Sequence, residues 1–251
     1  MNSLNINSPE YELRAKAVVN QLKELYLPGI SVNTVIFSYH KEKLNTLLLR
    51  FADSEYFMLS GGFILKNEDI DCAAKRNLSE RSKLENIYLE QFYTSGETET
   101  NSDETISIFK EKLGDGMADF LINQRYIRVC YYALVDEDKL KPSTSDFMVN
   151  EYKWVDAFHL PNLLFNHNFI VDKAVVKLQN DLDRELVHVG KNLMNNTFTM
   201  AELQKLYEAV YQREFTRTNF QRKMLSLDIL ERLEKQYNGN SHKAPYLYQF
   251  K

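Results

Sequence analysis

The stretch GFILKNEDIDCAAKRNLSERSKL, residues 62–84, decides the fold of this 251-residue chain. Just before it, EYFMLSGGF (55–63) predicts a short strand that ends in a turn at two adjacent glycines. Residues 68–82 predict a helix, because apolar side chains recur on one side of it at helical spacing. These apolar residues are Ile70, Ala73, Ala74 and Leu78. A strand, a glycine turn and an amphipathic helix are therefore expected here in that order.

Runs of β-branched and aromatic residues predict strands on both sides of this stretch. The expected strands are 32–39 and 44–50 with a turn at 40–43, then 88–95, 125–135 and the start of 151–167. The expected helices are 10–26, ended by Pro28-Gly29, and 168–186, whose Asp181, Asp183 and Glu185 should face solvent. Residues 97–123 predict a loop with some helix, and 189–196 predict a connector. The mixture predicts an α+β fold.

Composition narrows the class of protein. The net charge of −4 is uneven, because residues 197–251 carry nine Lys/Arg and six Asp/Glu, whereas the rest carries 22 and 29. A basic tail on an acidic body favours a polyanionic partner. No run of about 18 apolar residues and no secretory signal pattern is present, and two cysteines form no disulfide framework, so a cytoplasmic protein without a membrane span is expected. The five histidines show no metal-ligand spacing, so we expect neither a metal nor a cofactor.

Residues 62–84 resemble the Nudix box, whose pattern is Gly, five residues, Glu, seven residues, then Arg-Glu-aliphatic-x-Glu-Glu-x-Gly-aliphatic. The matching positions are Gly62, Glu68, Arg76, Leu78, Glu80 and Leu84. The resemblance implies a Nudix-like α/β/α sandwich with a mixed sheet. In that family, carboxylates on one helix face hold Mg²⁺ against a pyrophosphate.

Three departures from the pattern argue against catalysis. Asn77 and Arg81 replace two of the glutamates, and Lys83 replaces the glycine. A hard divalent cation needs several anionic oxygens, so we expect a catalytically inactive domain. The surviving Gly62, Glu68, Arg76 and Glu80 are then candidates for a ligand pocket. The alternative, which we favour, is structural: Gly62 would allow a loop with positive φ, and Glu68 would pair with Arg76 to hold that loop against the helix.

The C-terminal part predicts a winged helix-turn-helix. Thr199 and Glu202 form a capping box at the start of one helix, residues 213–216 break it, and a second helix is expected over about 217–233. A turn at Asn238-Gly239 between two strand-like pieces then completes the order of this motif.

The second helix has two faces at 100° per residue. Phe220, Met224 and Leu227 should pack on the first helix. The opposite face offers groups suited to base edges and phosphates, and the following turn adds two more. The candidate DNA-binding residues are Arg217, Thr218, Asn219, Gln221, Arg222, Lys223, His242 and Lys243.

The segment FTMAELQKLYEAVYQREFTRTNFQRKMLSLDILERL (198–233), ending in SHKAPYLYQF, resembles the C-terminal domain of Nudix-related transcriptional regulators, and likeness extends over about residues 30–251. The family includes repressors of NAD metabolism and sugar-responsive regulators of pentose use. The resemblance implies an N-terminal helical extension (1–28), a ligand-sensing Nudix-like domain (29–190) and a DNA-binding domain (191–251). It also implies a homodimer that binds double-stranded DNA at a palindromic operator, with a sugar or a ribose-containing nucleotide such as ADP-ribose as effector.

Two other functions stay open at this point. One is an active Nudix pyrophosphohydrolase with an appended DNA-binding domain. The other is a protein-interaction module with no role in nucleic-acid binding.

Overall fold

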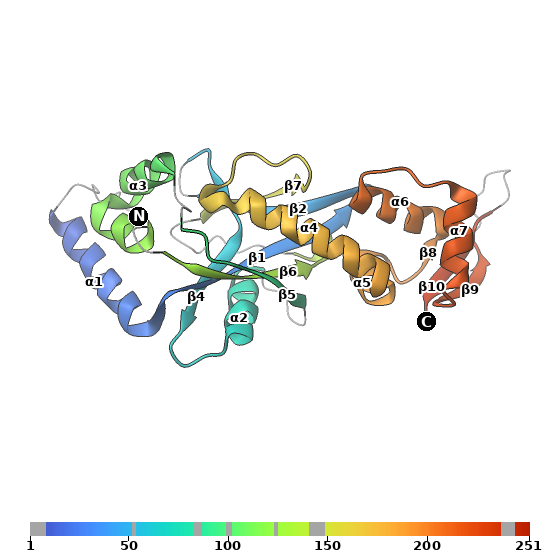
Figure 1. Ribbon diagram of the computed structural model, residues 1–251, viewed down its shortest axis with the longest axis horizontal. Coiled ribbons are helices and arrows are strands. Elements are labelled where there is room, and N and C mark those ends of the chain that lie inside the picture. Colours follow the sequence, from blue (N-terminus) through green and yellow to red (C-terminus); the bar gives the residue numbers. More distant parts are fainter. Residues whose placement is uncertain are drawn as a thin grey trace.

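The computed structural model describes residues 9–51, 54–82, 87–98, 102–122, 125–140, 149–236 and 244–251. The molecule is elongated, with helices α1 and α3 at one end and the C-terminal helices and small sheet at the other (Figure 1). None of the helices in these ranges combines the length and the apolar character that a membrane crossing requires.

The larger sheet is mixed and has the strand order β3-β2-β1-β6-β5, with β4 paired to β1 and β7 paired to β2. The central pair β1 and β6 is parallel, and the other pairs are antiparallel. The bounds are β1 Tyr26–His40, β2 Lys43–Phe51, β3 Phe57–Met58, β4 Ser60–Leu65, β5 Tyr88–Ser95, β6 Ile127–Leu134 and β7 Val149–Asp156. Each strand predicted from the sequence is present.

Helices cover both faces of this sheet. Successive side chains of a strand point to opposite faces, and the central strands carry apolar side chains on both. On β6, Val129 and Tyr131 pack with Ala73 and Ala74 of α2 (Ile70–Ser82). The alternate residues, including Cys130 and Tyr132, pack in the cluster formed with α4 (His167–Arg184). Figure 1 shows α4 and α2 on opposite sides of the strands, which confirms the α/β/α sandwich.

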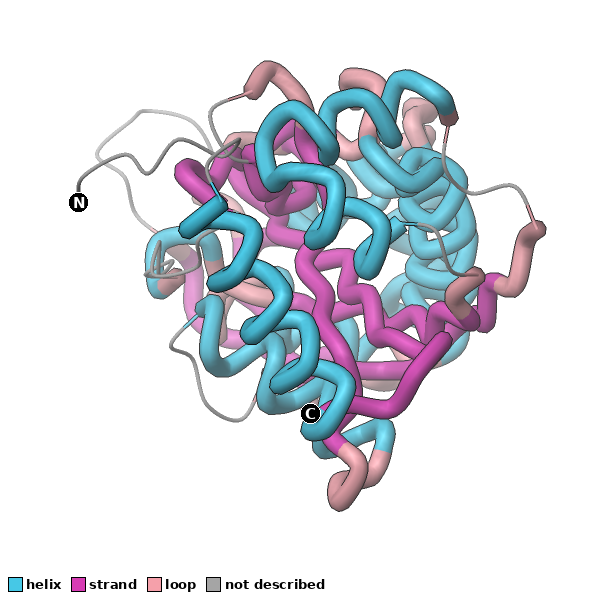
Figure 2. The backbone as a smooth tube through the Cα atoms, turned by 90° about the vertical axis from the view of Figure 1, so that its left-hand side faces the viewer, coloured by secondary structure: helices cyan, strands magenta, loops and turns pink. Residues whose placement is uncertain are grey.

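Helices α1 (Pro9–Leu25) and α3 (Asp103–Ile122) close the end of the sheet that is remote from the C-terminal domain. Seen from that end, helices lie in front of the strands (Figure 2). The prediction of a loop with some helix for 97–123 gave too little helix, because α3 covers most of this range as two helical pieces that meet in a kink at Gly114, whose φ of 71° and ψ of 159° are not helical. Ile108, Phe109 and Met117 of α3 are buried in a second core cluster, and this packing outweighs the glycine.

The glycines before α2 lie in a strand and not in the predicted turn. Gly61 and Gly62 belong to β4, and a Cβ on Gly61 would lie 2.6 Å from the carbonyl oxygen of Val32. Gly62 does not have the positive φ that was expected of it. Pro28 and Gly29 likewise lie inside β1, where the pairing with β4 is irregular and Gly29 has a φ of 68°. These glycines are required for close approach and for a bulge.

The C-terminal domain has the order helix, turn, helix and strand pair. Helix α6 (Met200–Tyr211) is followed by α7 (Arg217–Ser226), and β8 (Phe198–Thr199), β10 (Tyr246–Phe250) and β9 (Leu230–Lys235) form a three-stranded sheet in that order. The capping box is confirmed: the backbone N–H of Glu202 donates to Thr199, and the N–H of Thr199 donates to the Glu202 carboxylate.

Two boundaries in this part differ from the prediction. Residues 189–196 were expected to be a connector, but α5 (Leu186–Leu193) covers most of them, because Val189 and Leu193 are buried in the main core. The second helix ends at Ser226 rather than near 233, since Asp228 has a left-handed φ of 53° and the chain continues into β9. The turn predicted at Asn238-Gly239 lies outside the described residues.

One hydrophobic cluster runs from the larger sheet through α4 and α5 into α6 and α7. It includes Phe37 of the sheet, Leu178 of α4, Leu206 of α6 and Met224 of α7, all of them buried. The contact between the domains therefore has the apolar character of a core.

Candidate ligand cavity and nucleic-acid interface

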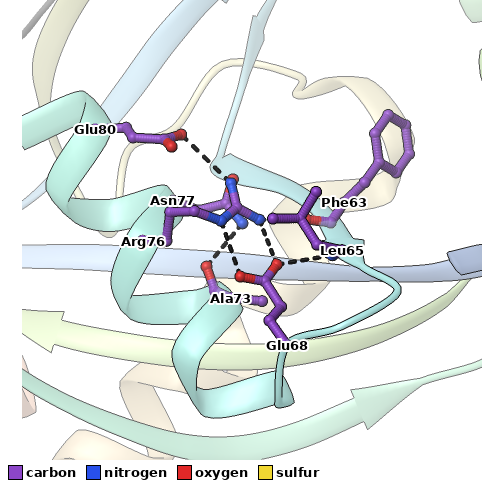
Figure 3. Close-up of polar contacts among 7 residues, drawn as sticks. All are labelled: Phe63, Leu65, Glu68, Ala73, Arg76, Asn77 and Glu80. Atoms are coloured by element: carbon purple, nitrogen blue, oxygen red, sulfur yellow. Dashed lines mark hydrogen bonds and ion pairs between the residues drawn. The ribbon is translucent and has the colours of Figure 1, made fainter. Parts of the chain in front are cut away.

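Three charged residues of the Nudix-like stretch, Glu68, Arg76 and Glu80, interact with one another (Figure 3). Arg76 donates from Nη2 to Glu68 Oε1 at 2.6 Å and from Nε to Glu68 Oε2 at 3.0 Å. Glu68 also accepts from the backbone N–H of Leu65 at 2.8 Å, and Arg76 donates to the carbonyl of Phe63 at 3.0 Å. The hydrogen bonds from Arg76 hold the pKa of the Glu68 carboxyl below its usual value. The pair thus joins the loop after β4 to α2, as the structural alternative predicted.

Asn77 occupies the position where the Nudix pattern has a glutamate, and it is buried. Its Nδ2 donates to the carbonyl of Ala73 at 2.8 Å, and a Cβ added to Gly62 would lie 1.9 Å from its Oδ1. Gly62 is therefore required by its closeness to Asn77.

These residues do not fit a magnesium ion. Both oxygens of Glu68 accept hydrogen bonds from Arg76, Asn77 is neutral, and the Glu80 carboxylate lies 3.5 Å from Arg76. In the part of the chain that the structure describes, no group of three or more His, Cys, Asp or Glu side chains could hold a metal ion. The side chain of Arg81 lies outside the described residues, but its charge is positive.

A cavity of about 310 Å³ opens between the larger sheet, α2 and α3. Gly62, Arg76 and Glu80 line it, whereas Glu68 is not among the lining residues. The rest of the wall is largely apolar and aromatic. Its aromatic members are Tyr26, Phe63, Phe109, Tyr126 and Phe165. A concave, mostly apolar space with a few polar groups is typical of small-molecule sites.

Two polar residues of this cavity were not found from the sequence. Arg128, on β6, is only 5% exposed, and its guanidinium lies 5.8 Å from the ring centre of Phe165. His167, at the start of α4, accepts at Nδ1 from the backbone N–H of Leu59 and lies 3.3 Å from the Asn33 amide. Burial, with the positive charge of Arg128, lowers the pKa of His167 to about 3, so its ring is neutral. No motif marks either residue, although the alternation of β6 puts Arg128 on the same face as buried Cys130.

The predicted recognition helix is α7, at the opposite end of the molecule from α1 (Figure 1). Phe220 is buried between the helices, 5.1 Å from the ring of Tyr207 and 5.8 Å from that of Phe215. Leu227, which was expected to pack beside it, is 44% exposed, because it follows the last residue of the helix. The residues predicted for DNA contact in α7 are exposed, except Gln221, which is half-buried. Positions His242 and Lys243 lie outside the described residues.

The charges on α7 differ in their partners. Arg222 donates to the Asn219 side chain at 3.1 Å, and Lys223 lies 3.5 Å from Asp183 of α4. Arg213, in the turn before α7, stacks on the rings of Tyr211 and Phe215 at 5.2 and 4.9 Å. It lines a concavity at the start of α7 and was missed because the sequence marked residues 213–216 only as a break.

The acidic face predicted for the long helix is only partly solvated. Asp181 of α4 is buried and accepts from Tyr132 at 2.5 Å and from Lys177 at 2.7 Å. Tyr88 lies 2.8 Å from Tyr132, so a polar network joins α4 to β5 and β6. The expectation for Asp181 was wrong because Tyr132, which buries it and donates to it, comes from a strand distant in sequence.

The fold and these two surfaces define a class: a Nudix-like domain joined to a winged helix. Residues 190–250 match the family model described as the NrtR DNA-binding winged helix domain. The C-terminal part of the chain is thus similar to this winged helix domain.

Known proteins are similar to this chain over most of its length. The ADPR responsive transcriptional repressor NtrR of Acinetobacter baylyi is 23% identical over 228 residues, which are 89% of this chain and 82% of the relative. The crystal structure of Shewanella oneidensis NrtR with a 27mer DNA has a TM-score of 0.63 at 24% identity, covering 88% of this chain and 93% of that one. A MutT/nudix family protein from Enterococcus faecalis has a TM-score of 0.62 at 16% identity, covering 98% and 100%. The structural likenesses show the fold.

Proposed function

We propose that this protein is a ligand-responsive transcriptional repressor. It binds double-stranded DNA through α7 and an effector through the cavity of a catalytically inactive Nudix-like domain. The observation that carries the proposal is the exposed face of α7, where Arg217 and Arg222 lie with no acidic residue in the helix. That face belongs to a domain whose family model is described as DNA-binding. In this proposal, residues 1–28 are an N-terminal extension, 29–190 the ligand-sensing domain and 191–251 the DNA-binding domain. The protein would act on chromosomal DNA in the cytoplasm.

A homodimer would place two α7 helices on a palindromic operator and double the phosphate contacts. Within α7, we assign Arg222, Asn219, Thr218 and Gln221 to base edges, and Arg217 and Lys223 to phosphates. In the wing, we propose that His242 and Lys243 also contact the DNA.

The effector that we propose is ADP-ribose, as in the name of the A. baylyi relative. The cavity supports this choice because it is concave, lined with aromatic rings, and bordered by Gly62, Arg76 and Glu80. Helix α4 would pass the signal on, because it begins at the cavity with His167 and contacts α6 farther along. Its Gln179 donates to the carbonyl of Val210 at 2.9 Å, and Tyr207 of α6 donates to its Leu182 carbonyl at 3.1 Å.

Loss of hydrolase activity is part of the proposal. It is supported by the neutral, buried Asn77 and by Glu68, whose oxygens are occupied by Arg76. Incubation of the purified protein at high concentration with ADP-ribose and Mg²⁺ should release no phosphate product. Metal-dependent turnover would show instead that the protein is an active hydrolase with a DNA-binding domain.

A gel-shift titration tests the main claim. The full chain should retard a fragment from upstream of its own or a neighbouring operon, with an excess of unrelated DNA present, and the affinity should fall as salt rises. Addition of ADP-ribose should change the affinity, while ribose serves as the unphosphorylated comparison. Absence of sequence-selective retardation would contradict the proposal and favour a protein-interaction module.

A further inference from the structure

The cavity contains a buried positive charge that has no counter-charge among the residues that the structure describes. Within the described part of the chain, the guanidinium of Arg128 takes part in no ion pair, and its Nη1 has no hydrogen-bond partner although the atom is shielded from solvent. The ring of Phe165 is an apolar contact with only a weak attraction for a cation.

An arrangement of this kind is unfavourable in a folded protein. A buried charge is normally paired, since transfer from water removes its hydration, and each unmet donor adds to the loss. Burial accordingly lowers the pKa of Arg128, although the group stays protonated in proteins. A planar guanidinium has five donors in a fork that matches two oxygens of a phosphate or carboxylate.

The other polar residues of the cavity do not neutralise Arg128. His167 is neutral, Asn33 is uncharged, and Glu80 is an exposed carboxylate that lies beside Arg76. Glu97 is the acidic residue whose charge acts on Arg128, but its carboxylate accepts from Ser95 and forms no ion pair with the arginine. The interior of the cavity is therefore positive and surrounded by aromatic side chains.

We propose that Arg128 binds a phosphate group of the effector and thereby makes the cavity select a phosphorylated nucleotide over its unphosphorylated form. This inference rests on the proposed function, because it assigns a specificity-determining residue to the same cavity. The phosphate supplies the acceptors that the chain withholds from Arg128. Rings such as Phe63 and Tyr126 give a planar base an apolar wall.

Calorimetric titration of the full chain tests the assignment with four probes: ADP-ribose, AMP, adenosine and ribose. The wild type should bind the two phosphorylated compounds, and adenosine should bind at least about tenfold more weakly than AMP. Arg128→Met removes the charge and keeps the length of the side chain, and should weaken ADP-ribose binding about 100-fold. Arg128→Lys keeps the charge without the fork and should give an intermediate loss.

Arg125→Met is the matched control. Arg125 lies just before β6, is exposed, does not line the cavity, and donates to the carbonyl of Gly96. Its replacement should leave ADP-ribose binding within about twofold of the wild type, as expected for a surface change away from the ligand.

Thermal unfolding without ligand separates binding from structure. Since Arg128 gives up no partner, Arg128→Met should melt at or above the wild-type temperature, yet lose the shift that ADP-ribose produces. A large drop in the melting temperature without ligand would mean a structural arginine and would overturn the assignment.

The outcomes also separate this inference from the proposed effector. Suppose that AMP binds the wild type but not Arg128→Met, and that ADP-ribose binds neither protein. ADP-ribose is then not the effector, but the role of Arg128 in phosphate binding stands. If Arg128→Met binds the phosphorylated compounds as the wild type does, or if the wild type binds none of them, the assignment of Arg128 is overturned.

Discussion

Helices α2 and α7 both carry arginines, but they use them in opposite ways. On α2, Arg76 is held by Glu68 and by the carbonyl of Phe63, so its donors are used within the fold. On α7, Arg217 and Arg222 are exposed and form no ion pair in the described chain, where Arg222 contacts only an amide oxygen. Paired charges stabilise the Nudix-like domain, whereas unpaired charges remain available to a partner. Substitutions on α2 should therefore change stability, and substitutions on α7 should change binding.

The largest effect is expected at Glu68. Replacement by Ala leaves Arg76 without its main partner, and the free energy of unfolding should fall by about 3 kcal/mol. This is the low end for a buried pair because the Arg76 side chain is 25% exposed. Denaturant titration measures it. Glu80→Ala is the control: Glu80 is 61% exposed at 3.5 Å from the same arginine, and its loss should cost no more than about 0.5 kcal/mol. Equal effects of the two variants would contradict the structural role assigned to Glu68.

Arg222 provides the opposite half of the comparison. Arg222→Ala should weaken specific DNA binding by about 2 kcal/mol, roughly 30-fold, and change the free energy of unfolding by less than about 0.5 kcal/mol. Arg50→Ala is the matched control, since Arg50 is a half-buried arginine of β2 that pairs with Glu151 at 2.9 Å. It should leave DNA affinity unchanged. Loss of stability without loss of affinity in Arg222→Ala would assign α7 to the fold alone.

The third prediction concerns the cavity, where His167 should make the stability of the protein depend on pH. The pKa of His167 is lowered to about 3 by burial and by Arg128, against an ordinary value near 6.5. Between these values the unfolded chain takes up a proton that the folded chain does not, so stability falls as pH decreases below about 6.5. The loss from this group should reach about 2 kcal/mol at pH 5. Denaturant titrations from pH 7.5 to 5 should show it, and His167→Gln should make the slope shallower. An unchanged slope in the variant would mean that His167 titrates normally.

The sequence predicted elements wherever one residue type dominates a face. The run of β-branched and aromatic residues along β6 and the spacing of Ile70, Ala73, Ala74 and Leu78 on α2 were sufficient, because the first reflects a strand buried on both faces and the second a helix buried on one side. The capping box of α6 was also predictable, since its two partners are three residues apart. The prediction was least complete for α3, where a loop with some helix was expected and packing in the core extends the helix on both sides of the kink at Gly114.

Parts of the site depend on distant contacts and were not predictable. The proposed role of Arg128 depends on the lack of a hydrogen-bond partner for its Nη1 among the described residues, and such a lack cannot be read from local sequence. In the sequence Asp181 looks like a solvent-exposed acid, but in the fold it accepts a hydrogen bond from Tyr132 of β6. By contrast, the pairing of Glu68 with Arg76 was expected, because both lie in one strand-loop-helix unit.

The smallest change in stability is expected at the helix caps of the winged helix-turn-helix, where α6 and α7 differ. Thr199 accepts from the N–H of Glu202 at the start of α6, whereas Thr216 at the start of α7 makes no side-chain capping bond. Thr199→Ala should cost about 1 kcal/mol of stability, while Thr216→Ala should cost little, because no bond is lost. Thermal unfolding of both variants gives the difference. We expect Thr216→Ala to lower DNA affinity more than Thr199→Ala does, since an uncapped helix start can accept a phosphate, and the Thr216 hydroxyl can donate to it. If Thr216→Ala instead destabilised the fold as much as Thr199→Ala, the start of α7 would be a structural cap, and the contrast between paired and available groups would fail at that position.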